Sequence, residues 1–198
     1  MNKLSIQDRV AILNILSEGA GINAAARITG KSKNTVLKLL AEVGQACAAY
    51  QDRVMVNLPC KRIECDEIWS FVGAKQKNVR DDDEAHAHYG DCYTFTAIDP
   101  DTKLMPCWLV GVRTARCAED FMADLAPRLA DRVQLTTDGL QVYVDAVEKA
   151  FRGNVDYGML NKRYAGEAMQ KEAKRRYSPA TMTSVEKIRV FGNPAEQG

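Results

Sequence analysis

The sequence predicts a mixed α/β domain that follows a small all-α domain. Residues 1–45 contain three segments with helical spacing of apolar residues and no strand pattern. Residues 61–198 begin with runs rich in β-branched and aromatic residues, and amphipathic helical segments separate the later runs. A helical stretch at 46–60, which contains Pro59, is predicted to link the two domains.

The composition is that of an ordinary globular protein. Hydrophobic residues make up 46% of the 198 residues and charged residues 27%, which is enough apolar material for a core. No run approaches the roughly 20 apolar residues of a membrane span, and the N-terminus lacks the apolar segment of a secretion signal. The six cysteines form no C-x-x-C pair, so we expect reduced thiols in a cytoplasmic protein with no membrane partner. A zinc site at Cys60 and Cys65 is the weaker alternative.

The net charge of +1 conceals an uneven distribution. Residues 1–50 contain six Lys or Arg against three Asp or Glu, residues 51–150 twelve against eighteen, and residues 151–198 nine against five. Basic ends around an acidic middle are typical of a protein that binds phosphates and holds cations between them. Chance variation on a near-neutral surface is the alternative.

The first two helical segments have recognisable ends. Ser5 and Asp8 form a capping pair, and the apolar residues Val10, Leu13 and Leu16 follow at helical spacing. A short alanine-rich helix is predicted over 22–28, and Gly30 is placed to make the turn after it. Small side chains in this second segment allow the helices to cross closely.

The third segment predicts a recognition helix. Ser32 is a good N-cap, and the predicted buried face consists of Val36, Leu39, Leu40 and Val43. In a helix-turn-helix motif the start of this helix enters the major groove of DNA. The predicted DNA-binding residues are therefore Lys31, Ser32, Lys33, Asn34, Thr35 and Lys38. A helical bundle used for dimerisation is the alternative.

The second domain is predicted to contain five strands and two helices. The strands are expected over 62–73, 91–99, 104–112, 133–137 and 154–160, with one helix after Thr114 and one after Gly139. Trp69 and Trp108, which lie on strands, are expected in the core. The order β-β-β-α-β-α-β is that of the ribonuclease H-like fold, a mixed sheet flanked by helices.

Two acidic residues are candidate metal ligands and catalytic residues. Asp66 lies in a strand of residues that favour burial, where a carboxylate is costly unless it is paired or binds a metal. Asp138 closes the fourth strand, at the sheet edge where ligands collect in α/β proteins. Two carboxylates on neighbouring strands can share Mg²⁺ or Mn²⁺. Glu67 is expected to point away, because side chains alternate along a strand. A salt bridge at Asp66 and a simple turn at Asp138 are the alternatives.

Several stretches resemble transposases of the insertion sequence 1 family. They are CDEIWSFVGAKQKN (65–78), YTFTAIDPDTKLMPCWLVG (93–111), TTDGLQVYVDAVEKAF (136–151), NVDYGMLNKRY (154–164) and RRYSPA (175–180). The resemblance implies an enzyme in which three acids, of the DDE type, cut and join DNA with Mg²⁺. Asp66 matches the first acid and Asp138 the second. The resemblance also implies a homo-oligomer on double-stranded DNA, at transposon ends and target, in the nucleoid of a bacterial or archaeal cytoplasm.

The third acid of that family is a glutamate in an E-R-x-N motif, and no residue here matches it. Glu167, Glu172, Glu186 and Glu196 lack the Arg and Asn context, so the catalytic domain is expected to be C-terminally incomplete and only weakly active. The zinc ribbon that is frequent in the family is also not matched. The alternatives are a non-catalytic helix-turn-helix regulator of transposition and a cellular ribonuclease H-like nuclease.

Overall fold

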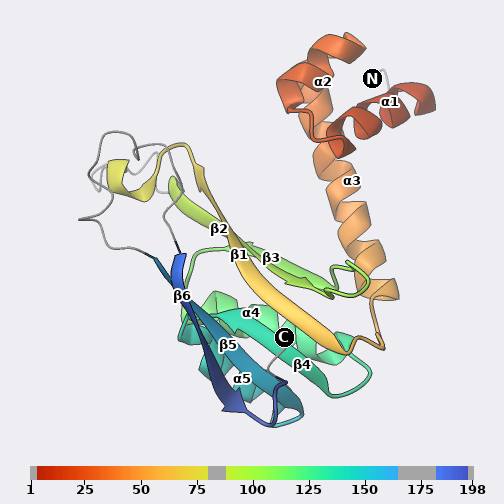
Figure 1. The fold of residues 1–198 in the computed structure, drawn as a ribbon. Helices are drawn as coiled ribbons and strands as arrows, with labels where there is room; N and C mark the ends of the chain where they lie inside the picture. The colour runs from red at the N-terminus through yellow and green to blue at the C-terminus, as the bar shows by residue number, and fades with distance from the viewer. Residues whose placement is uncertain (1–3, 80–87, 165–181, 196–198) are drawn as a thin grey trace. The chain divides into compact units, whose positions relative to one another are not determined.

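The computed structural model describes residues 4–79, 88–164 and 182–195, and the chain divides into two units, Met1–Val54 and Met55–Gly198 (Figure 1). The first unit consists of helices α1 (Ile6–Ser17), α2 (Ile22–Thr29) and α3 (Lys33–Val54). α3 continues without a break through residues 46–54, the first part of the predicted linker.

The caps predicted for these helices are confirmed. The Ser5 hydroxyl accepts a hydrogen bond from the Asp8 amide at 3.1 Å, and the Ser32 hydroxyl accepts one from the Thr35 amide at 3.1 Å. Gly30 ends α2 with φ at 65°, a left-handed conformation that glycine adopts without steric cost. The chain therefore turns sharply between α2 and α3, as the sequence predicts.

The core of the first unit is small. Its buried residues are Ile12, Ala25, Val36 and Leu39. Leu40 was expected on the buried face but is 42% exposed, so this part of the prediction is wrong. The buried Val36 and Leu39 and the partly buried Val43 form one stripe of α3. Leu40 lies about 40° from Val36 on the side away from Leu39, at the edge of that stripe.

A six-stranded mixed sheet forms the second unit. Its strands are β1 (Arg62–Val72), β2 (Gly90–Ile98), β3 (Cys107–Gly111), β4 (Val133–Asp138), β5 (Val155–Tyr164) and β6 (Met182–Phe191). They lie in the order β3-β2-β1-β4-β5-β6. The pairs β1–β4 and β4–β5 are parallel, and the remaining pairs are antiparallel. The five predicted strands are confirmed in their predicted order, and β6 is additional.

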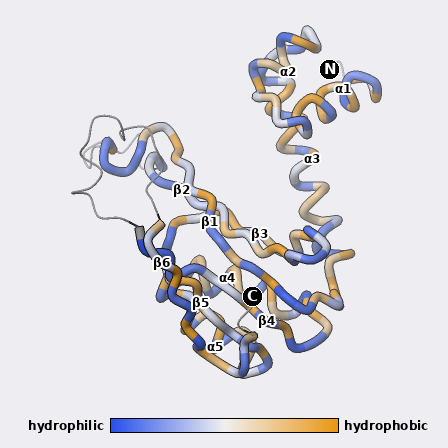
Figure 2. Tube along the Cα trace, viewed as in Figure 1, coloured by the Kyte–Doolittle hydropathy of each residue, from blue (hydrophilic) through white to orange (hydrophobic). Residues whose placement is uncertain are grey.

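Helices α4 (Ala115–Leu125) and α5 (Val142–Phe151) follow β3 and β4, as predicted, and their buried residues join the core of the sheet. Phe95 of β2 lies at its centre, with ring centroids 5.7 Å from Phe121 and 6.4 Å from Tyr143. Hydrophobic and hydrophilic stretches are interspersed along the second unit (Figure 2). Along β4, buried residues alternate with partly buried ones, as expected for a sheet with two different faces. In the described part of the chain, no helix is long and apolar enough to cross a membrane.

The two tryptophans do not lie in the core, which corrects the prediction. Trp69 is 43% exposed and Trp108 is 44% exposed. Trp108 alternates with Cys107 and Leu109, which belong to the core, so it lies on the other face of the sheet. Trp69 packs against Phe71 and under the Lys75 ammonium, 5.0 Å from the ring centroid.

Candidate metal centre

The parallel strands β1 and β4 pair over only three residues. The last pair is Glu64 with Thr136, both on the face opposite the core. Beyond it, β1 continues beside β2 while β4 ends at Asp138. Asp66 and Asp138 each lie two residues past that last pair, so the alternation of side chains places them on the same face at equal heights. The middle of β1 and the carboxyl end of β4 thus frame a cleft of about 550 Å³.

The carboxylates of Asp66 and Asp138 converge in this cleft. Together with Glu67 they each offer an oxygen, and these oxygens all lie within 4.8 Å of one another. Asp66 Oδ1 accepts a hydrogen bond from the Glu67 amide at 2.8 Å, and Asp138 Oδ1 accepts one from the Leu140 amide at 2.9 Å. Each aspartate therefore has one oxygen fixed by the backbone.

A tight turn after β4 orients Asp138. Gly139 lies so close to Asn161 of β5 that a Cβ at this position would be 1.5 Å from Asn161 Oδ1. A larger residue would have to displace Asn161, and the turn that directs the Leu140 amide to Asp138 would shift with it. The Asp-Gly pair is therefore part of the site as well as a turn.

Glu67 belongs to the cluster, contrary to the sequence prediction. Its side chain points to the core face and is only 2% exposed. There it accepts a hydrogen bond from the Tyr143 hydroxyl of α5. β1 and β4 are no longer paired beyond Glu64 and Thr136. Side chains from both faces of β1 can therefore enter the space between the two strands. The alternation rule holds, but it does not keep Glu67 out of the site.

Arg113 lies among these acids and was not predicted. One of its terminal nitrogens is 3.0 Å from Glu67 Oε2 and 3.0 Å from Asp138 Oδ2. Its guanidinium carbon lies 5.8 Å from the centroid of the Tyr93 ring. Arg113 lies two residues beyond the end of β3. A basic residue just after a strand was the signal in the sequence that could have suggested it.

The environment changes the acidity of two groups in the cluster. Burial raises the pKa of the Glu67 carboxyl, although the Tyr143 hydrogen bond and Arg113 act in the opposite direction. Burial, and then the hydrogen bond to Glu67, raises the pKa of the Tyr143 hydroxyl. Tyr143 therefore stays protonated and remains a hydrogen-bond donor to Glu67.

The donor set fits a divalent cation that prefers oxygen. Three carboxylates and one guanidinium leave the cluster net negative, and Mg²⁺ and Mn²⁺ bind carboxylates together with water and phosphate. Asp66 is exposed and the Asp138 side chain is 37% exposed, so both are accessible from solvent.

The predicted DNA-binding residues lie in the first unit, around the start of α3. Lys33, Asn34 and Lys38 are exposed. Ser32 and Thr35 bind each other, with hydroxyl oxygens 2.8 Å apart. Lys31 pairs with Asp8 at 2.9 Å. The first three side chains are therefore accessible, whereas the other three are already engaged within the unit.

The candidates for a third acid divide into two groups. Glu167, Glu172 and Glu196 lie outside the described residues. Glu186 of β6 pairs with Arg163 at 3.1 Å and is not part of the cluster of Asp66, Glu67 and Asp138.

The sequence matches no protein-family model and no curated protein. Among solved structures, the chain is similar to the Mos1 transposase paired-end complex with left transposon end, at 14% identity and a TM-score of 0.35. It is also similar to a piggyBac transposase synaptic complex with hairpin DNA, at 11% identity and a TM-score of 0.40. The matches cover 79% and 88% of this chain but only 60% and 47% of those chains. With TM-scores below 0.5, neither likeness bears on the function of this chain.

Proposed function

We propose that the chain is a DNA transposase of the insertion sequence 1 type, with a ribonuclease H-like catalytic unit and a helix-turn-helix unit that binds transposon ends. The observation that supports this most is the convergence of Asp66 and Asp138 at the point where β1 and β4 separate. The reaction is metal-dependent cleavage and strand transfer of DNA, performed by a homo-oligomer on double-stranded DNA.

In this proposal Asp66 and Asp138 hold Mg²⁺ or Mn²⁺, and the other residues position them. A bound divalent ion supplies charge stabilisation at the phosphoryl group and activation of the attacking hydroxyl or water. The Leu140 amide fixes the orientation of Asp138, and the Glu67 amide fixes that of Asp66. Tyr143 holds Glu67 at the rear of the cleft.

A regulator that binds transposon DNA without cutting it is the second candidate. The position of Arg113 favours it, because a guanidinium 3.0 Å from two of the acids neutralises part of the charge that a metal requires. Glu67 is also committed to Tyr143 and Arg113, so within the cluster Asp66 and Asp138 are the two acids that are accessible from solvent. We therefore expect the chain alone to cleave DNA slowly.

Nicking of supercoiled plasmid DNA in Mn²⁺ tests the proposed function. We expect slow nicking that chelation abolishes and that Asp138→Asn reduces by at least about 100-fold, because a metal ligand is lost. Glu64→Gln is the matched control, since Glu64 lines the same cleft on the neighbouring strand β1 but lies outside the cluster. Nicking that survives in Asp138→Asn would exclude this site. DNA binding without nicking would favour the regulator.

A second prediction concerns the DNA-binding unit. We expect Lys33→Ala with Lys38→Ala to weaken binding to duplex DNA and to reduce the slope of log affinity against log salt by about two units, or roughly one per lost phosphate contact. Fluorescence anisotropy over a salt series measures both quantities. Arg53→Ala is the control, because 20 residues of helix place Arg53 about 30 Å from Lys33. Equal salt slopes in the unmodified chain, the double variant and Arg53→Ala would show that the start of α3 does not contact DNA.

A further inference from the structure

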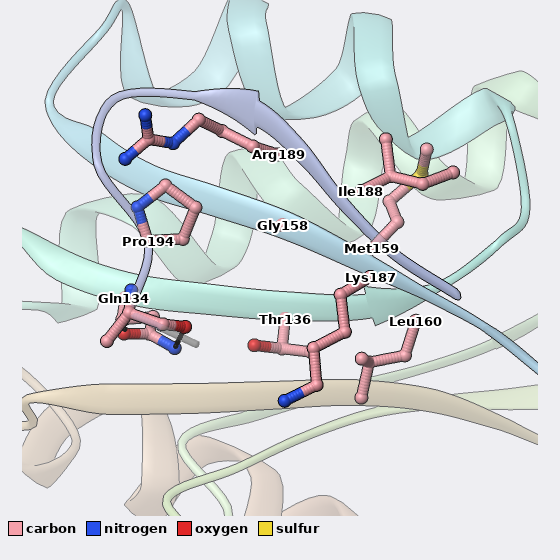
Figure 3. A pocket seen from close by; sticks show the side chains of 10 residues that line it. Gln134, Thr136, Gly158, Met159, Leu160, Lys187, Ile188, Arg189 and Pro194 are labelled. Atoms are coloured by element: carbon pink, nitrogen blue, oxygen red, sulfur yellow. Dashed lines mark hydrogen bonds between the residues drawn. The ribbon is translucent and has the colours of Figure 1, made fainter. Parts of the chain in front are cut away.

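A second hollow lies on the sheet face opposite the core, over β4, β5 and β6. It has a volume of about 450 Å³, and the residues used below are Gln134, Thr136, Gly158, Leu160, Lys187 and Arg189 (Figure 3). Their neighbours on β4 and β5, such as Leu135 and Tyr157, point into the core. These six residues therefore lie on the face away from the core, and two of them are cationic. Met159 and Ile188, which also line the hollow, belong to the core or pack against it.

This hollow adjoins the acidic cleft. Thr136 and Leu160 line both, so the two hollows are neighbours across the sheet, and we call them together the groove. The register fixes the distances along it, because Asp138 pairs with Leu160 and Leu160 pairs with Lys187. Lys187 is thus two strands from Asp138, at a backbone separation of about 10 Å.

The second cation lies one step along the same face. Thr136 pairs with Gly158, and Gly158 pairs with Arg189. Lys187 and Arg189 are two residues apart on β6, so their side chains leave the same face about 7 Å apart. They present a row of positive charge that leads towards the acids.

Gly158 has no side chain, so the hollow is deeper between β4 and the two cations of β6. A Cβ at this position would lie 3.4 Å from the Ile188 carbonyl oxygen and 3.6 Å from Pro194 Cβ, which is ordinary contact. The nearby Asp156 is bound by Arg132 at 3.0 and 2.8 Å and by the Asn193 amide at 2.7 Å. The acid beside Arg189 is therefore already paired.

We propose that this groove binds the sugar-phosphate backbone of one DNA strand next to the acidic cleft, with Lys187 and Arg189 contacting its phosphates. The inference rests on the proposed function for the identity of the polyanion. Phosphates are repelled by Asp66, Glu67 and Asp138, so a strand that reaches them needs cations on the way. Lys187 and Arg189 would contact the phosphates directly, at distances well below the Debye length of about 8 Å at physiological ionic strength, where salt screens the attraction least.

Binding of labelled single-stranded DNA to the full chain in EDTA tests the proposal. Single-stranded DNA lacks the major groove that a recognition helix reads. Each lost phosphate contact lowers the salt slope by about 0.7 for single strands. We expect Lys187→Gln with Arg189→Gln to lower the slope by about 1.4 and the affinity about tenfold. The charge-conserving pair Lys187→Arg with Arg189→Lys should keep the slope.

Two further variants control for charge and for shape. Lys149→Gln with Arg152→Gln removes two exposed cations from α5, which packs on the other face of the sheet, and should leave the slope unchanged. Gly158→Val fills the floor of the groove without changing charge and should weaken binding several-fold.

An unchanged slope and affinity in the Lys187 and Arg189 pair would overturn the proposal. A change in oligomeric state in place of DNA affinity would also overturn it, since the groove would then bind a second protein chain. Because EDTA removes metal, this test does not depend on the acids. If the unmodified chain nicks DNA but the Lys187→Gln, Arg189→Gln variant keeps the full salt slope, only the groove is refuted. If the variant loses the slope as expected but the unmodified chain does not nick DNA, only the metal-dependent function is refuted.

Discussion

Replacing Asp66 with asparagine is expected to remove at least about half of the stabilisation of the second unit by Mn²⁺. A ligand at about 100 times its dissociation constant stabilises a protein by about 2.7 kcal/mol. For a unit of this size that corresponds to a rise in Tm of about 5–10 °C. With one carboxylate fewer, we expect affinity to fall at least tenfold and the rise to shrink to a few degrees.

The same substitution should raise the Tm slightly in EDTA. Three carboxylates within 4.8 Å of one another repel, and a neutral amide relieves part of that repulsion. The combination of a higher Tm without metal and a smaller response to metal distinguishes a ligand from a residue that only supports the fold. Calorimetric melting with and without Mn²⁺ measures both, and Glu64→Gln serves again as the control. An unchanged metal response in Asp66→Asn would argue against a shared ion.

Replacing Arg113 with alanine is expected to act in the opposite direction on metal binding. The guanidinium is 3.0 Å from oxygens of Glu67 and Asp138, so it competes with an incoming cation for the same charge. Two unit charges 4 Å apart interact by about 4 kcal/mol at an effective dielectric constant of 20. The 38% exposure of the Arg113 side chain reduces this to about 1–2 kcal/mol. We therefore expect Mn²⁺ affinity to rise about tenfold.

Without metal, Arg113→Ala should lower the Tm, because Glu67 is left buried with only the Tyr143 hydrogen bond. Arg116→Ala is the matched control, since Arg116 pairs with the exposed Asp120 on α4 and is not part of the cluster. Manganese titration followed by electron paramagnetic resonance gives the affinity directly. A fall in affinity in Arg113→Ala would show that Arg113 orients the acids and does not compete with the ion.

The order of elements was predictable because it depends on local patterns. Thr114 caps α4, with its hydroxyl accepting from the Cys117 amide at 3.4 Å, and Pro106 delays the start of β3 to Cys107. Both features are visible in short stretches of sequence. β6 was missed because its apolar residues Met182, Val185 and Ile188 recur at every third position and do not alternate as in a typical strand. Backbone pairing with β5 makes it a strand.

Apart from β6, the sequence by itself determined the order of the helices and strands, the caps at Ser5, Ser32 and Thr114, and the two aspartates at strand positions where a carboxylate needs a partner. Only the tertiary structure decided the composition of the cluster. Glu67 and Tyr143 are 76 residues apart, and Arg113 and Asp138 are 25 apart. The physical reason is that β1 and β4 pair over only three residues and then separate. The alternation of side chains along a strand determines the face from which each side chain projects. The distance between the two strands determines which other side chains it can contact, and that distance is a property of the tertiary structure.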